Sequence, residues 1–258
     1  MSLFGKSEID ETLSRIAMAH ADGYGLLIRR RKGPGDGWFP ATDLGPDGPA
    51  PPVLLSNVRG LSEPPPDHIR AEWLLESVAR ALADLGGSFL VSARRLPDLT
   101  PGNVLLAAEG GLVRATGVIG EEMTVVEGDP AAGRPGITDA AGWEELADLF
   151  RIGFIDLLAP LIGWLDENGL RPEKTLWHAA ADRLAQSLIW SGKAFEDREF
   201  AAAVTSRVTG GDDRLRIQLG TGEDEYGERY HLRNTCCLAY RTPEGGLCRA
   251  CPLHKERN

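Results

Sequence analysis

The sequence has no long uninterrupted apolar run. Its longest apolar stretch, residues 152–165, is interrupted by Asp156 and Pro160 and is shorter than the roughly 20 residues that a membrane-spanning helix needs. The N-terminal residues also lack the basic segment followed by an apolar segment that is typical of a secretory signal. We therefore expect a cytoplasmic protein without an integral membrane segment.

Basic residues are in the minority. The formal net charge is −10 and the isoelectric point is about 5.1, which argues against a nucleic-acid partner because such proteins need a basic face. The charge is uneven, however: residues 229–258 carry six basic and two acidic side chains, a net +4, and leave −14 for residues 1–228. This positive stretch could offset the charge of a metal site and attract an anionic ligand or acidic electron donor, or it could simply be a solvated surface.

Several catalytic patterns are absent. There is no HExxH helix, no Ser/His/Asp order and no dinucleotide fingerprint, so a redox protein with this sequence would have to receive electrons from another protein. One short motif, residues 98–105, resembles the D-x4-N-x-L loop of kinase-like phosphotransferases. Gly120 stands where those proteins place a metal-binding Asp, and no phosphate loop precedes the motif. A phosphotransferase is therefore a minor alternative, because Pro101-Gly102-Asn103 is also ordinary turn chemistry.

Cysteine is scarce and confined to one place. The four cysteines of the 258-residue chain follow the pattern C-C-x10-C-x2-C between residues 236 and 251. A Cys-x-x-Cys pair lets two sulfurs meet a metal across a tight turn, and residues 242–246 have the composition of a turn that folds the chain back. Since a cytoplasmic chain keeps its thiols reduced, we interpret the four cysteines as one metal site and not as disulfides.

The ligand set alone does not identify the metal, because four thiolates hold both structural zinc and iron–sulfur clusters. Zinc sites usually have two Cys-x2-4-Cys pairs, whereas here one pair is adjacent in sequence. Adjacent side chains in an extended chain point to opposite faces, which suits a two-iron cluster with two thiolates on each iron. The pairing of cysteines with irons stays undetermined, and a zinc-stabilised binding protein without redox activity remains the alternative.

The C-terminal stretch resembles a known family. Its R-x-x-C-C-L-x-Y-R motif (residues 233–241) and its closing C-P-L (residues 251–253) are similar to those of FhuF-type ferric-siderophore reductases, over about residues 229–253. The resemblance implies that a [2Fe-2S] cluster is the cofactor. By position, its ligands would be Cys236, Cys237, Cys248 and Cys251.

The resemblance also implies an activity and its partners. Members of this family act in iron acquisition as oxidoreductases that reduce Fe(III) by one electron in a hydroxamate-like siderophore and release Fe(II) in the cytoplasm. The electron would come from an external donor such as a ferredoxin or a flavoprotein reductase. The side chains that flank the thiols and are candidates for siderophore or donor contacts are Arg233, Tyr240, Arg241 and Arg249.

The periodicity of the chain predicts an α+β fold. We expect an N-terminal part with mixed helix and antiparallel sheet, a central helical part, and a small C-terminal [2Fe-2S]-binding lobe. The corresponding domains would be residues 1–228, a ferric-siderophore reductase-like α+β and helical domain, and residues 229–258, the cluster-binding segment.

Local patterns place the elements. Ser7 and Asp10 form a capping box at the start of a first helix, and the nine prolines of residues 33–66 predict a long loop without a regular helix. A helix is expected from Asp67 to about Leu85, ended by Gly86-Gly87. The remaining expected strands are residues 24–31, 89–91, 104–106, 112–119 and 214–219, and the turn at Gly110-Gly111 predicts that 104–106 and 112–119 form a hairpin. Further helices are expected to start at Thr138 or Asp139, at Pro172 and at Asp197.

Overall fold

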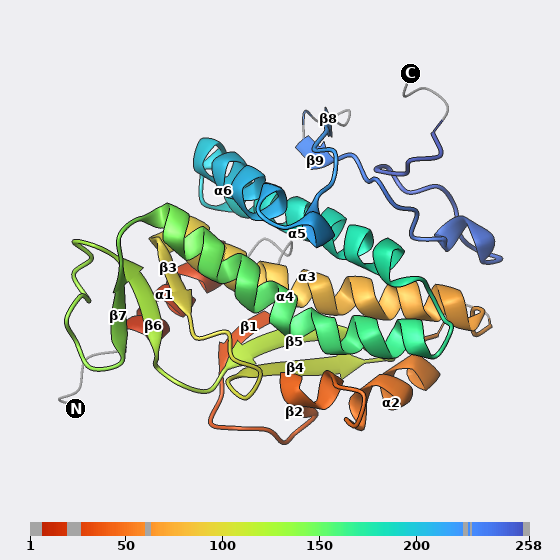
Figure 1. The fold of residues 1–258 in the computed structure, drawn as a ribbon, viewed down its shortest axis with the longest axis horizontal. Coiled ribbons are helices and arrows are strands. Elements are labelled where there is room, and N and C mark those ends of the chain that lie inside the picture. Colours follow the sequence, from red (N-terminus) through yellow and green to blue (C-terminus); the bar gives the residue numbers. More distant parts are fainter. Residues whose placement is uncertain (1–6, 20–26, 60–62, 224–226, 228, 255–258) are drawn as a thin grey trace.

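The computed structural model describes residues 7–19, 27–59, 63–223, 227 and 229–254 (Figure 1). The α-helices within these ranges are α1 (Glu8–Ala19), α2 (Ala50–Asn57), α3 (Asp67–Ala93), α4 (Trp143–Glu167), α5 (Glu173–Ala194) and α6 (Arg198–Gly210). The strands are β1 (Leu27–Arg30), β2 (Trp38–Pro40), β3 (Arg95–Pro97), β4 (Val104–Glu109), β5 (Leu112–Val118), β6 (Met123–Val126), β7 (Ile137–Ala140), β8 (Thr221–Glu223) and β9 (Arg229–His231).

The strands form three small sheets. The first has the order β1-β5-β4-β2, the second β3-β6-β7, and the third pairs β8 with β9. The pairings are antiparallel except for β1 with β5 and β6 with β7, which are parallel. The expected α+β class is confirmed, and the expected hairpin is β4–β5, closed by Gly110 and Gly111 with positive φ.

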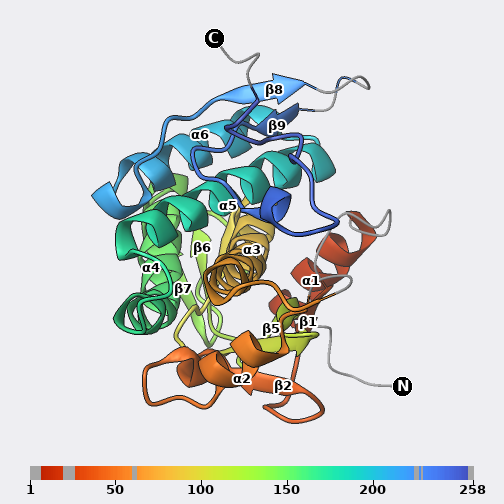
Figure 2. The same ribbon diagram turned by 90° about the vertical axis from the view of Figure 1, so that its right-hand side faces the viewer.

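Helix α3 is the centre of the molecule. One side of it covers the β1-β5-β4-β2 sheet, α4 lies beside it, and α5 crosses the side remote from the sheet (Figure 2). The β8–β9 pair and the C-terminal segment lie on the outer side of α5. Large apolar side chains fill the interior, and the largest that are fully buried include Phe89, Phe150 and Phe154. Burial of apolar area is therefore the main stabilising term.

The expected end of the third helix was wrong. α3 continues through Gly86 and Gly87 to Ala93, and residues 89–91 are helical. A Cβ at Gly86 would lie 2.3 Å from the Phe150 ring, and one at Gly87 would lie 3.1 Å from Leu188. The two glycines therefore do not end the helix but allow α4 and α5 to approach it closely.

Two other expectations were also wrong. Residues 33–66 were expected to lack a regular helix, but residues 50–57 form α2. Its prolines lie in the first turn of the helix, where the backbone N–H that proline lacks would have no intrahelical partner. Residues 214–219 are not a strand: the chain passes through a short 3₁₀ turn at Asp213–Leu215 and then runs without regular structure. The capping box is confirmed, since Ser7 Oγ accepts from Asp10 N and donates to the Asp10 carboxylate at 2.9 Å.

The central helices begin close to where the pattern placed them. α5 starts directly after Pro172, and the Asp197 side chain caps α6. α4 starts at Trp143 and not at Thr138 or Asp139, which lie in β7. None of the described helices is long and apolar enough to cross a membrane.

Candidate metal centre

The cysteine segment, residues 229–254, crosses the outer face of α5 with little regular structure of its own (Figure 2). Directly after Cys237 the chain reverses at Leu238, which has a φ of 61°, a left-handed conformation that costs a non-glycine residue about 1 kcal/mol or more. This turn directs Leu238 N toward Cys236 Sγ at 3.4 Å. Leu253 N makes the equivalent contact with Cys251 Sγ at 3.5 Å.

The four thiols are free. They lie near enough to affect one another: Cys237 and Cys251 both act on the pKa of Cys236, and Cys237 and Cys251 both act on that of Cys248. Cys251 is buried and the other three thiols are half-buried. Within the described part of the chain, no three His, Cys, Asp or Glu side chains gather closely enough to hold a single metal ion.

The two members of the Cys237–Cys248 pair differ in acidity. The hydrogen bond from Cys248 lowers the pKa of Cys237 to about 6, against the effect of burial and with help from Ala239 N and the Arg233 guanidinium. The same hydrogen bond raises the pKa of Cys248.

Asp182 on α5 holds the cysteine segment against that helix. Its fully buried carboxylate accepts hydrogen bonds from Thr235 N at 2.8 Å, Thr235 Oγ1 at 2.7 Å and Asn234 N at 2.9 Å. It also accepts from Asn234 Nδ2 at 3.0 Å and contacts His231 Nε2 at 2.8 Å. These bonds lower its pKa although burial opposes ionisation. The residues just before Cys236 are thus fixed by one side chain.

Glu76 on α3 provides a second anchor. Its buried carboxylate accepts from Arg183 on α5 and from Arg233 in the cysteine segment. Burial opposes its ionisation, but the two guanidinium groups outweigh burial and lower its pKa. Trp73, also on α3, donates from Nε1 to the Cys237 carbonyl at 2.9 Å, so the segment is tied to the central helix as well as to α5.

Glu72 lies one turn before Glu76 and is fully buried. Burial raises its pKa to about 7, the Glu76 carboxylate adds to this, and Arg171, 3.1 Å away, and Arg233 oppose it. One of its oxygens, Oε1, has no hydrogen-bond partner in the protein. Around neutral pH this carboxyl group is therefore divided between its protonated and ionised forms.

We expect Glu72→Gln to change how stability depends on pH. Because the folded pKa of about 7 lies above the unfolded value, the wild type loses stability as pH rises from about 4.5 to 7, by up to about 3 kcal/mol. The neutral amide escapes this loss, so the variant should gain stability relative to the wild type between pH 5 and pH 8. Denaturant unfolding at both pH values measures the difference. The exposed Glu167→Gln is the control, and equal pH slopes for wild type and Glu72→Gln would contradict the assignment.

A cavity of about 200 Å³ lies beside the Cys237–Cys248 pair, between α5 and β9. Three buried donor atoms of its lining residues have no partner in the protein, namely Arg183 Nε, Gln186 Nε2 and Arg233 Nε. An orphaned buried donor typically costs 1–3 kcal/mol, on the order of one whole hydrogen bond. These atoms have almost no accessible surface, and the accessible lining of the cavity is mostly apolar.

The candidate contact residues do not form one surface. Arg233 is buried in its ion pair with Glu76, and the Arg249 guanidinium lies 4.4 Å from the centre of the Tyr230 ring. Arg233 and Arg249 both line the cavity beside Cys237. Tyr240 and Arg241, hydrogen-bonded to each other at 3.0 Å, line a separate cavity of about 340 Å³ with residues 63–66.

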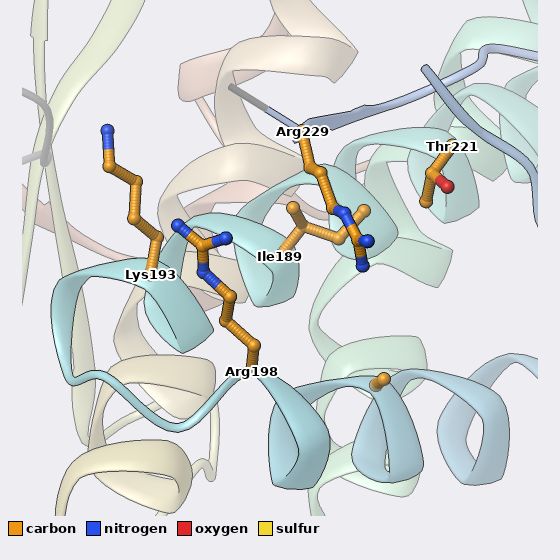
Figure 3. A pocket seen from close by; sticks show the side chains of 6 residues that line it. Ile189, Lys193, Arg198, Thr221 and Arg229 are labelled. Atoms are coloured by element: carbon orange, nitrogen blue, oxygen red, sulfur yellow. The ribbon is translucent and has the colours of Figure 1, made fainter. Parts of the chain in front are cut away.

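Another cationic cavity lies at the C-terminal end of α5. It measures about 90 Å³ and has no thiol in its lining. Figure 3 shows Lys193 near the end of α5, Arg198 at the start of α6 and Arg229 on β9 around Ile189. Arg229 also pairs with Glu223 at 3.2 Å. An anion could also bind in this cavity, but no cysteine lines it.

The kinase-like motif has a structural role. Asp98 accepts from Thr100 N at 3.0 Å, and Asn103 donates from Nδ2 to the Asp98 carbonyl at 2.7 Å. The Asn103 side-chain oxygen accepts from Gly120 N at 2.6 Å. These bonds close the turn before β4 and hold it against the end of β5, so both side chains serve the turn.

The candidate site is therefore built from four free cysteines on a helical support. Residues 233–253 match the FhuF 2Fe-2S C-terminal domain family. The match names a 2Fe-2S domain, and all four cysteines lie within the matched residues.

Other comparisons add little. A crystal structure of the petrobactin biosynthesis protein AsbB from Bacillus anthracis str. Sterne is similar with a TM-score of 0.36 and 11% identity. The alignment covers 63% of this chain and 30% of that protein, and a likeness this weak defines neither fold nor function. A search of curated protein sequences gives no match.

Sequence reasoning missed the residues that support the site. Asp182 and Glu76 lie inside long helices, where the periodic pattern shows only the apolar positions. The one local signal is that Asp182 follows three consecutive alanines, which leaves room for another segment to approach α5 closely. The contact of Glu76 with Arg233 joins residues 157 positions apart and has no local signature.

Proposed function

We propose that this protein is a ferric-siderophore reductase in which Cys236, Cys237, Cys248 and Cys251 hold a [2Fe-2S] cluster. The observation that carries the proposal is the match of residues 233–253 to the FhuF 2Fe-2S domain, a stretch that contains all four free cysteines. Four thiolates can hold two irons, with two thiolates on each. The residues present therefore fit the cluster.

The protein would control the cofactor through its own groups. A bound cluster supplies reversible one-electron chemistry. Leu238 N and Leu253 N donate to the cysteine sulfurs, and the Arg233 guanidinium lies close enough to influence Cys237. Hydrogen bonds and positive charge at the sulfurs favour the reduced state and so raise the reduction potential. The three half-buried thiols lie near the surface, where a donor protein can approach.

The proposed reaction is a single electron transfer. One electron from an external donor, a ferredoxin or a flavoprotein, reduces the Fe(III) of a bound siderophore to Fe(II). Hard oxygen ligands hold Fe(II) less tightly than Fe(III), so the iron then dissociates. No proton or covalent bond changes hands in the reduction itself.

The proposal is tested on anaerobically purified protein. We expect two irons and two sulfides per chain, an EPR signal after one-electron reduction, and release of Fe(II) from a ferric siderophore when reduced ferredoxin is supplied. Cys248→Ser should lose the signal and the activity. One zinc per chain with no sulfide, persisting after attempted cluster reconstitution, would contradict the reductase and support the zinc-stabilised binding protein.

We further propose that Cys236 and Cys251 hold one iron and that Cys237 and Cys248 hold the other. The apoprotein of Cys236→Ser, mildly oxidised and alkylated, should form the Cys237–Cys248 disulfide and leave Cys251 labelled. Cys237→Ser should instead leave Cys248 labelled. Trypsin cleaves after Arg249, which separates the last two cysteines for mass spectrometry. A label on Cys237 or Cys248 in Cys236→Ser would show a different pairing.

A further inference from the structure

The peptide group between Cys237 and Leu238 is held at both ends. Its carbonyl oxygen accepts a hydrogen bond from Trp73 Nε1 at 2.9 Å, and its N–H donates from Leu238 N to Cys236 Sγ at 3.4 Å. The carbonyl and the N–H of a trans peptide point in opposite directions within one plane, and none of the described peptide bonds is cis. The side chain that fixes the oxygen therefore also directs the N–H toward the sulfur.

Trp73 is itself held by the central helix. It lies on α3 and is a partly buried side chain that packs against the core. Its indole N–H can only donate, so the direction of the hydrogen bond to the Cys237 carbonyl does not depend on a choice of tautomer or of amide orientation. This one bond joins residues 164 positions apart and fixes the peptide at the adjacent cysteines from the most buried helix of the protein.

Leu238 does not favour this orientation of the peptide by itself. Its φ of 61° is left-handed, a conformation that is unfavourable for a residue with a Cβ. Turning the peptide by half a rotation, with the chain on either side left in place, would give Leu238 a negative φ, which leucine adopts more readily. The same rotation would bring the carbonyl oxygen toward Cys236 Sγ in place of the N–H. The observed orientation is therefore maintained by contacts with other residues, and the Trp73 hydrogen bond is one of them.

The orientation matters because of the charge on the sulfur. An N–H directed at a ligand sulfur stabilises negative charge there, and that charge increases when a cluster accepts an electron. A carbonyl oxygen in the same place would repel it. Leu253 N makes the equivalent contact with Cys251 Sγ at 3.5 Å, but through a different peptide. Loss of the Trp73 hydrogen bond should therefore alter the contact at Cys236 and leave the contact at Cys251 as an internal reference.

We propose that Trp73 is a positioning residue for the cluster: its indole N–H holds the Cys237–Leu238 peptide with the N–H toward Cys236 Sγ and so raises the reduction potential. The inference rests on the proposed function, because it concerns the potential of the cluster that the four cysteines would hold. It adds a residue outside the matched segment, on α3, to the groups that determine how easily the protein accepts an electron.

Trp73→Phe keeps an aromatic ring but removes the donor. We expect the reduction potential of the cluster-loaded variant to become more negative, with the equilibrium between the reduced and oxidised forms shifted about tenfold, or about 59 mV for one electron, because a hydrogen bond to a charged group is lost. A spectroelectrochemical titration under anaerobic conditions measures the shift. Trp164→Phe on α4 removes the same volume from another partly buried tryptophan that packs against the core, so it is the matched control and should keep the wild-type potential.

A second substitution tests whether the effect passes through the peptide. Glycine adopts the left-handed conformation without a steric penalty, so Leu238→Gly should keep the peptide orientation when the indole donor is absent. Trp73→Phe should therefore shift the potential less than about half as far in the Leu238→Gly background as in the wild type, in a double-mutant cycle. The single variant Leu238→Gly accounts for the loss of the buried leucine side chain.

Pulsed EPR observes the contact directly. In protein labelled with nitrogen-15 leucine, the reduced cluster should couple to the backbone nitrogens of Leu238 and Leu253, whose N–H groups contact Cys236 Sγ and Cys251 Sγ. Trp73→Phe should weaken the Leu238 coupling and keep the Leu253 coupling. Adding Leu238→Gly would remove the label from this position, so the comparison is made between the wild type and the single variant.

The outcomes are distinct. A more negative potential with a weakened Leu238 coupling supports the proposal, even if the protein reduces no ferric siderophore, a result that would refute the reductase alone. An unchanged potential in Trp73→Phe, or an equal shift in Trp164→Phe or in the Leu238→Gly background, would overturn it and leave the hydrogen bond a purely structural role. If Trp73→Phe does not retain the cluster, the double variant with Leu238→Gly should regain it, and continued loss would also overturn the proposal.

Discussion

Asp182→Asn is expected to release the cysteine segment from α5 while leaving the helical core folded. The wild-type carboxylate is fully buried and accepts from the backbone or side chains of His231, Asn234 and Thr235. An amide offers one acceptor oxygen in place of two and carries no charge. Removing one side of such a buried charged network typically costs about 3–5 kcal/mol, and here the loss falls on the residues directly before Cys236.

Hydrogen exchange is the direct measurement. Amides of residues 231–238 should exchange at least about a hundredfold faster in Asp182→Asn, because an opening free energy lowered by about 3 kcal/mol corresponds to that factor, and iron content should fall with them. Amides of α3 and α4 should stay protected. Asp213→Asn removes a carboxylate that is 87% exposed and pairs with Arg216, so it controls for the substitution itself. Unchanged exchange in residues 231–238 would show that Asp182 does not hold the segment.

Glu76→Gln is expected to cost about as much free energy as Asp182→Asn, but to destabilise the whole domain and not only the cysteine segment. Its carboxylate lies between Arg183 and Arg233, and all three groups meet where α3, α5 and the cysteine segment converge. The variant leaves two guanidinium groups without a counter-charge, at a cost of about 3–5 kcal/mol in the free energy of unfolding. Because the folded pKa of Glu76 is lowered, this stabilisation is present above the unfolded pKa and is lost as pH falls through the folded value.

A triple variant separates charge from volume. Glu76→Leu combined with Arg183→Met and Arg233→Met removes the whole network, and an apolar replacement of a buried ionic triad is often neutral or stabilising. We therefore expect denaturant unfolding to show the triple variant more stable than Glu76→Gln. Its cluster should nevertheless have a more negative reduction potential, since the positive charge beside Cys237 is gone. A triple variant less stable than the single one would refute the electrostatic account.

Local sequence was informative where the physics is local. The cap at Ser7, the turn glycines of the β4–β5 hairpin and the helix start at Asp197 depend on neighbouring residues, and the structure confirms each. The errors came where tertiary packing replaced local preference. Gly86-Gly87 has the composition of a helix end, yet these residues are helical because Phe150 and Leu188 occupy the space beside them.

The same division applies to the site. The sequence by itself determined the four thiols, their spacing and the basic character of the segment around them, because residue type and spacing are enough to identify a set of metal ligands. Only the tertiary structure decided that Arg233 is buried against Glu76 while Arg241 faces a different cavity, and that Asp182 fixes the chain before Cys236. These contacts join residues far apart in the chain, and their free energy comes from burying charged groups together, which no local pattern encodes.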